Sequence, residues 1–334
     1  MHVPLLVLGG ALVLLALFDA IVTALSLVKG TGPMSGRVAR GMWRALLALH
    51  ARRGGAGRIL QWSGTCTLMS TFAAWTVALW AGWWCVFTAQ EQAVVTSQTQ
   101  QPADGWARVY FTGYTLFTLG TGDYVPGTAW TQVATTVAAL TGLFVVTLSI
   151  TYFVQVVQGV VHKREVAQHI HTLGRDGADI VVGGWTGEGF SPMFNQHLVS
   201  LTAPLLRLAE QHVAYPIVHY FHAPSPRKAP ACAVAALDDA LLLLRYALPA
   251  DARPDPSATG PLWMAVGQVL RTLRPFFPAA DRERPEVPVS ALRRAGLPTV
   301  DEAEYRGAVR DHAERRRLLR GFLSSDGWDS RHGA

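Results

Sequence analysis

The chain has 334 residues, of which 50% are hydrophobic and only 16% are charged, with a formal net charge of +6. A soluble protein usually has about 25% charged residues, so this composition argues against a purely soluble protein. The basic balance could indicate nucleic acid, but the arginines of the first half lie beside apolar runs, so we expect anionic lipid headgroups and no nucleic acid.

The chain begins with a long apolar run over residues 3 to 28. A helix needs about 20 residues to cross a bilayer, whereas a signal peptide has a basic start and an apolar core of about 7–15. We therefore predict a retained transmembrane helix within a first domain, residues 1–29. Asp19 lies inside this run. It is either a hydrogen-bonded or protonated side chain packed against threonines of the next span, or part of a sensor or relay.

A basic segment, residues 30–61, follows the first span. Together with the preceding Lys29, this segment has no acidic residue and seven basic ones: Lys29, Arg37, Arg40, Arg44, Arg52, Arg53 and Arg58. Such a segment belongs on the cytoplasmic side of a membrane. Apolar residues recur at helical spacing between Val38 and Leu49. The pattern fits an amphipathic helix with headgroups at Arg37, Arg40 and Arg44, or equally a solvated linker, and Gly54, Gly55 and Gly57 end it.

A second span is predicted over Cys66 to Phe87, with an aromatic belt at its interfaces formed by Trp62, Trp80, Trp83 and Trp84. The loop from Gln90 to Asp104 is polar and has no Lys or Arg, so we expect it outside the cell. Asp104 is a plausible N-cap for a short helix from Gly105 to Phe117.

The stretch Thr118-Leu119-Gly120-Thr121-Gly122-Asp123 lies between two membrane-length runs. Its two glycines can adopt positive φ angles, so that successive carbonyls can point to one side. A ring of such carbonyls can replace the water around a dehydrated cation. Because one chain supplies too few ligands, several copies must surround a common axis. The stretch therefore predicts an ion selectivity filter.

The segment from Arg108 to Trp130 resembles the pore loop of tetrameric potassium channels, bacterial channels with a two-helix pore module above all. Those channels carry Thr-Val-Gly-Tyr-Gly-Asp, and the match falls on Thr118, Leu119, Gly120, Gly122 and Asp123, with Pro126 and Trp130 also in place. The resemblance covers roughly residues 65 to 160. It implies a homotetramer, a pore module over residues 62–162, a hinge at Gly142, and potassium ions bound at Thr118, Leu119, Gly120 and Thr121.

One position departs from that family: the usual filter Tyr or Phe is Thr121. In the family this aromatic side chain packs against the pore helix and helps to hold the carbonyl ring at its diameter. Tyr110, Phe111 and Tyr114 of the predicted pore helix could support the filter instead. We expect Tyr114 to be the substitute, through a hydrogen bond from its hydroxyl to filter backbone.

A third span is predicted over Ala129 to Val161, and its end should project into the cytoplasm. Two stripes compete to line the pore. The resemblance favours an apolar one, formed by Leu143, Val146, Ile150, Val154 and Gln158. The polar alternative is formed by Thr147, Thr151, Gln155 and Gln158.

The second half divides into a glycine-rich linker, residues 163–189, and a helical cytoplasmic domain, residues 190–334. We expect Gly174 to Gly189 to form turns. Helical patterns then cover Met193–Val213, Ala229–Tyr246, Pro261–Phe276 and Asp301–Leu323. We interpret Arg315, Arg316 and Arg317 as a solvated helix face, with lipid or acidic-partner binding as the alternative. For His212, His219 and His222 core or capping roles are favoured over a metal or proton sensor, because ligand spacing is absent.

Three cysteines, Cys66, Cys85 and Cys232, are too widely spaced for a metal site or a disulfide framework. We expect them to be buried as small apolar side chains.

These features together predict an all-α integral membrane protein with three transmembrane helices, a re-entrant pore helix and filter, and an all-helical cytoplasmic domain. The expected function is a potassium-selective channel of the cell (inner) membrane, with a cytoplasmic C-terminus, no catalytic residues and no cofactor. Two alternatives stay open: a weakly selective monovalent cation channel, and a membrane-anchored sensor or enzyme with a non-conducting pore module. No nucleophile–base or metal constellation in the second half supports an enzyme.

Overall fold

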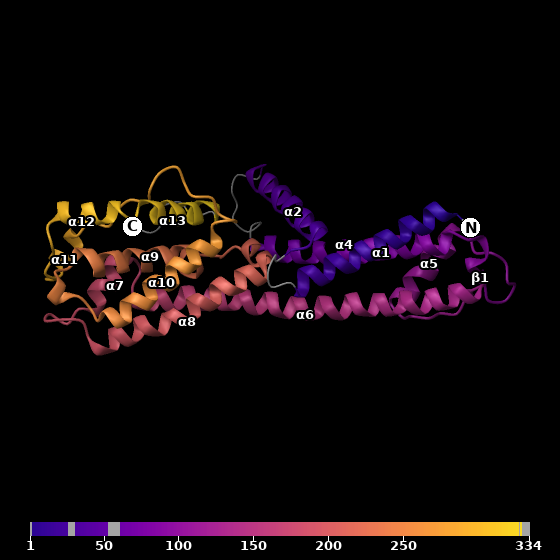
Figure 1. Ribbon diagram of the computed structural model, residues 1–334, viewed down its shortest axis with the longest axis horizontal. Helices are drawn as coiled ribbons and strands as arrows, with labels where there is room; N and C mark the ends of the chain where they lie inside the picture. The colour runs from indigo at the N-terminus through magenta and orange to yellow at the C-terminus, as the bar shows by residue number, and fades with distance from the viewer. Residues whose placement is uncertain (1, 26–30, 53–60, 327, 329–334) are drawn as a thin grey trace. The chain divides into compact units, whose positions relative to one another are not determined.

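A computed structural model describes residues 2–25, 31–52, 61–326 and 328, and most of them are helical (Figure 1). The chain forms two compact units. Unit 1 comprises Met1–Val157 and Ala214–Tyr220, and unit 2 comprises Gln158–Val213 and Phe221–Ala334. The basic and glycine residues Lys29, Arg53, Gly54, Gly55, Gly57 and Arg58 lie outside the described residues.

Unit 1 is built from long helices that pack along one another. Its elements are α1 (Val3–Leu25), α2 (Pro33–Arg52), α4 (Ser63–Thr88), η1 (Glu91–Ala93), β1 (Val94–Thr96), α5 (Gly105–Leu116), β2 (Tyr124–Pro126), the first part of α6 (Ala129–Leu173) and η2 (Pro216–Tyr220). Helices α1 and α4 run side by side (Figure 1). At Gly9 and Gly82 the two backbones come so close that a Cβ on Gly9 would lie 2.5 Å from the Gly82 carbonyl oxygen. Small residues allow this close approach between membrane helices.

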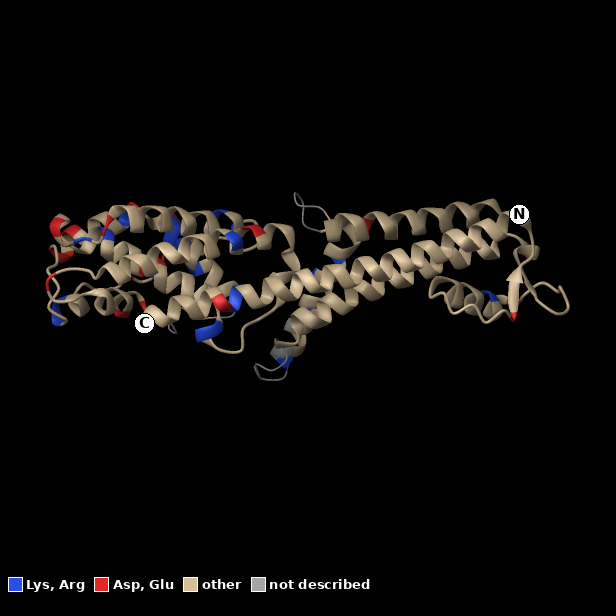
Figure 2. Cartoon of the chain, turned by 90° about the horizontal axis from the view of Figure 1, so that it is seen from below, with Lys and Arg blue, Asp and Glu red and all other residues tan. Residues whose placement is uncertain are grey.

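Two of the described helices, α1 and α6, are long and apolar enough to cross a membrane. Figure 2 shows that charged residues are sparse along the long helices of unit 1. Helix α4 has 26 residues and no charged side chain, but it is less apolar, because it contains tryptophans, threonines and serines. Its assignment as the second of three spans therefore stays a prediction.

Asp19 lies in α1 with none of its surface exposed, and its carboxylate joins three helices. It accepts hydrogen bonds from the backbone N–H of Met34 at 2.6 Å and of Ser35 at 3.0 Å, both in the first turn of α2. It also accepts bonds from the Ser35 hydroxyl and, at 2.8 Å, from Trp75 Nε1 of α4. A carboxylate at a helix N-terminus satisfies free N–H groups and suits the helix dipole. The hydrogen-bonded interpretation is confirmed, with Trp75 as the partner on α4, while packing against threonines of that helix stays a prediction.

Helix α2 confirms the predicted helix in the basic segment, and Arg37, Arg40 and Arg44 are all exposed on it. The apolar residues Val38 and Met42 are half-buried. On the same helix Trp43 packs against Tyr220 of η2, with ring centroids 5.6 Å apart. One face of α2 is therefore packed against the rest of unit 1, whereas Arg37, Arg40 and Arg44 lie on its exposed face.

The expectation of an all-α protein was wrong in one place, because β1 and β2 pair as a small antiparallel sheet. The register joins Val94 to Pro126 and Thr96 to Tyr124. The loop after α4 is polar overall, so no strand was predicted in it. It nevertheless contains a short strand of β-branched residues, Val94–Thr96, and the partner strand directly follows the predicted filter. This sheet ties the loop to the segment that leaves the filter.

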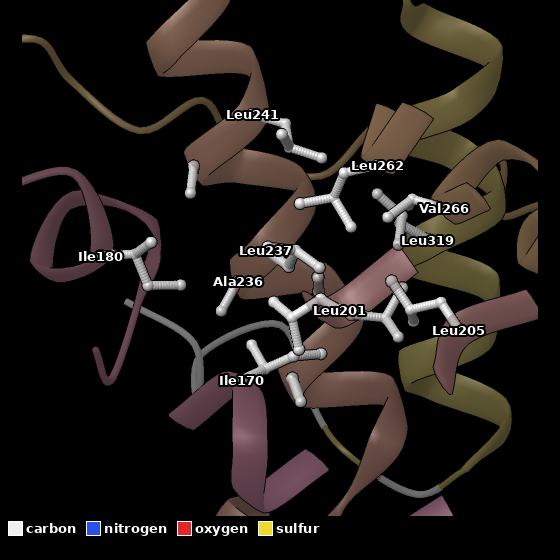
Figure 3. Packing of buried hydrophobic residues seen from close by; sticks show 14 of the residues in the cluster. Ile170, Ile180, Leu201, Leu205, Ala236, Leu237, Leu241, Leu262, Val266 and Leu319 are labelled. Atoms are coloured by element: carbon white, nitrogen blue, oxygen red, sulfur yellow. The ribbon is translucent and has the colours of Figure 1, made fainter. Parts of the chain in front are cut away.

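Unit 2 is a helical domain around the fully buried helix α9. Its elements are the end of α6, α7 (Gly177–Gly184), α8 (Pro192–Ala214), η3 (Pro226–Lys228), α9 (Pro230–Leu242), a π-helical turn (Leu243–Ala247), η5 (Ala250–Ala252), α10 (Pro256–Leu273), α11 (Ser290–Arg294), α12 (Glu302–Arg310) and α13 (Ala313–Ser325). Leucines and alanines of α9 pack with Leu201 and Leu205 of α8 and Leu262 of α10 (Figure 3). The four predicted helical patterns are confirmed, the last of them as two helices.

The glycine-rich segment contains a helix, so the expectation of turns was wrong for α7. Asp176 caps this helix by accepting a hydrogen bond from Asp179 N at 2.9 Å. Two of its glycines sit where a side chain would collide: a Cβ on Gly177 would lie 2.6 Å from Asp239 Cβ, and one on Gly184 2.5 Å from the Phe194 ring. Close packing, not a turn, explains both glycines.

The solvated face predicted for the arginine run was also wrong for two of its three residues. Arg316 is 1% exposed and its guanidinium lies 3.3 Å from Asp239, which also pairs with buried Arg284. Arg315 pairs with buried Asp238 at 2.5 Å and lies 3.9 Å from the centre of the Trp263 ring. Only Arg317 is exposed, as predicted.

Replacing Asp239 should destabilise the protein strongly, because the change leaves Arg284 and Arg316 buried without a countercharge. We expect Asp239→Asn to cost about 3–5 kcal/mol. The melting temperature of the purified full-length chain should then fall by about 4–7 °C. The control is Glu314→Gln, which breaks an exposed 3.3 Å pair with Arg274 and should change little. Equal melting temperatures for the two variants would show that the buried pair is not needed.

Candidate ion-conduction site

The site begins with α5, whose start and packing follow from its sequence. Asp104 accepts a hydrogen bond from Ala107 N at 2.8 Å, which confirms the predicted N-cap. The last turns of the helix are buried: Phe111 is 1% exposed, and its ring packs edge-on against Phe87 of α4 at 5.1 Å. Trp80 of α4 lies against Gly113, where a Cβ would be 2.4 Å from the indole. Helix α5 is therefore fixed against α4.

The filter backbone alternates between positive and negative φ. Thr118, Gly120 and Gly122 have φ angles of +56°, +61° and +81°, whereas the residues between them are not in the positive region. The positive φ angles predicted for the two glycines are confirmed. An alternation of left- and right-handed residues turns successive N–H groups to one side of the chain, and so turns the carbonyls to the other.

Thr118 was not expected to share this conformation. A positive φ is a true outlier for a β-branched residue and costs about 1–3 kcal/mol. The position is held by backbone bonds to the end of α5: Thr118 N donates to Thr115 O at 3.1 Å, and Leu119 N donates to Tyr114 O at 2.8 Å. The strained residue thus marks the point where the helix turns into the filter.

The carbonyls of the predicted filter lack hydrogen-bond donors among the described residues. Within the described residues, the carbonyl oxygens of Thr118 to Gly122 accept no hydrogen bond from backbone or side chain. Residues 117–123 are all exposed, and Leu119 is 69% exposed. The first carbonyl beyond this stretch to accept a bond is that of Asp123, from Ser97 N at 3.0 Å. Carbonyl oxygens without a donor can act as cation ligands.

The side chains expected to support the filter pack against one another. Tyr114 is buried, and its ring contacts Tyr110 at 5.1 Å and Phe111 at 5.3 Å. Its hydroxyl donates a hydrogen bond to the carbonyl of Tyr124, directly after the filter, and not to a filter carbonyl. Thr121 itself is exposed.

Gly142 lies inside α6, which is unbroken over Ala129–Leu173. A Cβ at this position would lie 2.1 Å from the Leu116 carbonyl oxygen, so the glycine allows α6 to approach the end of α5. The hinge role stays a prediction.

The exposed part of α6 includes both stripes proposed to line the pore. Leu143, Ile150, Val154 and Gln158 of the apolar stripe are exposed and Val146 is half-buried, while Thr147, Thr151 and Gln155 of the polar stripe are exposed. Buried residues such as Ser149 and Tyr152 form the opposite face. The choice between the stripes stays open.

Comparison with known proteins adds two findings. Residues 65–159 match the ion channel family. The whole chain is similar to the uncharacterized membrane protein YdjJ of Bacillus subtilis (strain 168), with 30% identity over 321 residues, which covers 96% of this chain and 93% of that protein. The chain belongs to the YdjJ family of membrane proteins. No solved structure matches the chain.

Within this member of the YdjJ family, residues 65–159 are an ion channel pore domain. The likeness to YdjJ extends through unit 2 as well, because it covers nearly the whole chain. The two proteins are therefore similar in sequence over both the pore domain and the helical domain of unit 2.

The sequence analysis assigned no role to Arg108. This residue is only 6% exposed, and its side chain connects several segments of the pore domain. Its guanidinium donates hydrogen bonds to four carbonyl oxygens, those of Phe87 (2.7 Å), Gln90 (2.9 Å), Glu91 (2.6 Å) and Ala103 (2.9 Å). These bonds join the end of α4 and both ends of the following loop to α5. A lone arginine in an aromatic helix was the available signal, because a buried guanidinium must find acceptors.

His212, His222 and two of the three cysteines are packed against other parts of the protein. His212 Nδ1 donates to Leu208 O at 2.7 Å, and burial lowers its pKa to about 4. His222 stacks on the Trp328 ring at 5.3 Å. Cys85 and Cys232 are buried as expected, but Cys66 is only partly buried.

Alanine at either filter glycine should stop ion flux. Gly120 and Gly122 both have open space where a Cβ would be added, so the obstacle is the positive φ alone, about 1–2 kcal/mol for each residue. We expect ion flux into liposomes to be lost in Gly120→Ala and in Gly122→Ala while both variants still assemble.

The matched control is Gly105→Ala at the first residue of α5, which also has open space but no positive φ. This variant should conduct like the native protein. Unchanged flux in both filter variants would refute the filter assignment.

Proposed function

We propose that the protein is a homotetrameric potassium channel, in which ions pass down their gradient along the carbonyls of Thr118, Leu119, Gly120 and Thr121. The supporting observation is the row of exposed carbonyls without donors, set by alternating φ angles. Irregular backbone at membrane depth is tolerated only where it is buried in protein or lines a water-filled path. Permeant ions and water supply the missing partners of these oxygens.

The tetramer follows from the number of ligands. One chain contributes a single carbonyl at each level of the filter, whereas potassium filters use four such loops around one axis. Closed symmetric assemblies are the usual form of homo-oligomers. The exposed surface of α6 supports this arrangement, because an exposed inner helix can face the central axis with one stripe and a neighbouring subunit or lipid with the other.

The distribution of charges supports the proposed arrangement of the remaining parts. Asp123 follows the filter and is exposed, so it raises the cation concentration at the outer mouth. The basic helix α2 lies on the cytoplasmic side, with Arg37, Arg40 and Arg44 toward anionic headgroups. Unit 2, after the inner helix α6, is the cytoplasmic domain that assembles or gates the pore.

The competing function is a weakly selective cation channel, which Thr121 favours because the filter lacks the aromatic side chain of the potassium channel family. We favour potassium because the filter sequence otherwise resembles that of the potassium channel family, and the change at Thr121 removes no carbonyl ligand.

The test is flux of potassium and of sodium from the purified protein in liposomes, with the mass of the same preparation measured in several detergents. We expect a tetramer that passes potassium far better than sodium. A permeability ratio near one would favour the weakly selective channel. A monomer or dimer without flux would favour a membrane-anchored sensor or enzyme.

Neutralising the α2 arginines should weaken binding of anionic lipid. Each basic residue near an anionic surface contributes about 1 kcal/mol, so replacing Arg37, Arg40 and Arg44 together with Gln should remove about 3 kcal/mol. Native mass spectrometry should find fewer phosphatidylglycerol molecules on this variant. The same three changes at exposed Arg282, Arg310 and Arg317 of unit 2 serve as the control. Equal lipid retention in the two variants would place α2 in solvent as a linker.

A further inference from the structure

Tyr114 contacts the filter segment at both of its ends. Its backbone carbonyl accepts a hydrogen bond from Leu119 N at 2.8 Å, where the filter begins. Its side-chain hydroxyl donates to the carbonyl of Tyr124, the residue after Asp123. A single residue of α5 therefore spans the segment from Leu119 to Tyr124.

The side chain that makes this connection is held rigidly. Tyr114 is 7% exposed, and edge-on contacts with Tyr110 and Phe111 fix its ring from two sides. Tyrosine has only two side-chain torsions, so little freedom remains once the ring is packed. Phe111 in turn packs on Phe87 of α4, so the support reaches the helix behind the pore helix.

The far anchor is equally well placed. Tyr124 is the first residue of β2 and is paired with Thr96 of β1. Its ring lies 6.3 Å from that of Tyr110. The neighbouring carbonyl of Asp123 accepts from Ser97 N at 3.0 Å. The hydroxyl of Tyr114 thus joins the pore helix to the sheet that ends the filter.

Between these two ends the carbonyls of Leu119 to Gly122 accept no hydrogen bond within the described residues, and the Asp123 carbonyl beside the far anchor accepts one from Ser97 N. The spacing of the carbonyl oxygens then depends on the distance between the ends. We propose that Tyr114 is a strut that fixes this distance through Leu119 and Tyr124, and is thereby a specificity-determining residue. This proposal rests on the proposed potassium channel.

The geometry favours Tyr114 over the neighbouring candidates. Thr121 is exposed and short, so it cannot brace the filter from behind. Tyr110 contributes its ring, but no hydrogen bond of its hydroxyl is found within the described residues, and it is 43% exposed. The hydroxyl of Tyr114 is the group that reaches backbone beyond the filter.

The experiment compares Tyr114→Phe with Tyr110→Phe in the full-length protein. Each change removes one hydroxyl and keeps the ring. Two quantities are measured: the potassium-to-sodium permeability ratio in liposomes, and hydrogen exchange of the peptide that contains Val94 to Ser97. The exchange measurement does not require the protein to conduct.

For Tyr114→Phe we expect the permeability ratio to fall by about two- to tenfold, the range for loss of one neutral hydrogen bond. The amide of Ser97 should exchange faster by a similar factor, because the Asp123–Tyr124 backbone is less restrained. Tyr110→Phe should match the native protein in both measurements.

Two results would overturn the proposal. If Tyr114→Phe and Tyr110→Phe match the native protein in both measurements, the hydroxyl restrains nothing. If exchange becomes faster but the permeability ratio is unchanged, Tyr114 holds the backbone without setting selectivity. A native protein that does not select potassium would instead refute the proposed function, and the exchange comparison would still show whether Tyr114 restrains the filter.

Discussion

Successive peptide carbonyls from Thr118 to Gly122 have no hydrogen-bond donor within the described chain, and this constraint shapes the rest of the pore domain. An unpaired carbonyl costs several kcal/mol in a bilayer, so the segment must line a wet path or be enclosed by other copies. The alternating φ angles turn these unpaired oxygens to one side of the chain, where they can act together as ligands. In the proposed channel, these oxygens replace the water molecules that a cation loses on entering the filter.

Such a segment needs a rigid frame, and the frame combines groups that the sequence does not mark as functional with two that it does, Asp19 and Tyr114. Arg108 joins the end of α4 and the following loop to α5 through four carbonyls. Gly9 and Gly82 bring α1 and α4 into close contact, and Asp19 connects α1 with α2 and α4. The ends of the filter are attached to this frame by the backbone and the hydroxyl of Tyr114.

The local features of the pore domain could be predicted because they depend on local chemistry. Asp104 is a good N-cap in any context, and Gly120 and Gly122 adopt positive φ where side chains resist it. Thr118 adopts the same conformation against its own preference, because backbone bonds to α5 hold it there, and such tertiary effects cannot be predicted from propensity. The acceptor of the Tyr114 hydroxyl was missed for a related reason: Tyr124 is brought near by a sheet whose strands have three residues each.

In unit 2 the periodicity of apolar residues predicted the long helices, since burial of one face determines them. The predictions failed where tertiary packing gives a residue a role that differs from its usual one. Glycines at 177 and 184 indicated turns but serve close helix contacts, and Arg316 indicated solvent but is buried beside Asp239. A single sequence does not reveal which distant residue will fill the space or supply the countercharge.

The central claim, that the carbonyls of Thr118 to Thr121 hold cations on a symmetry axis, can be tested directly by structure determination with rubidium in place of potassium. Anomalous scattering would locate the rubidium ions. We predict a fourfold assembly with rubidium on its axis, at the level of these carbonyls. An assembly without fourfold symmetry, or a fourfold axis with no rubidium beside Thr118 to Thr121, would contradict the account.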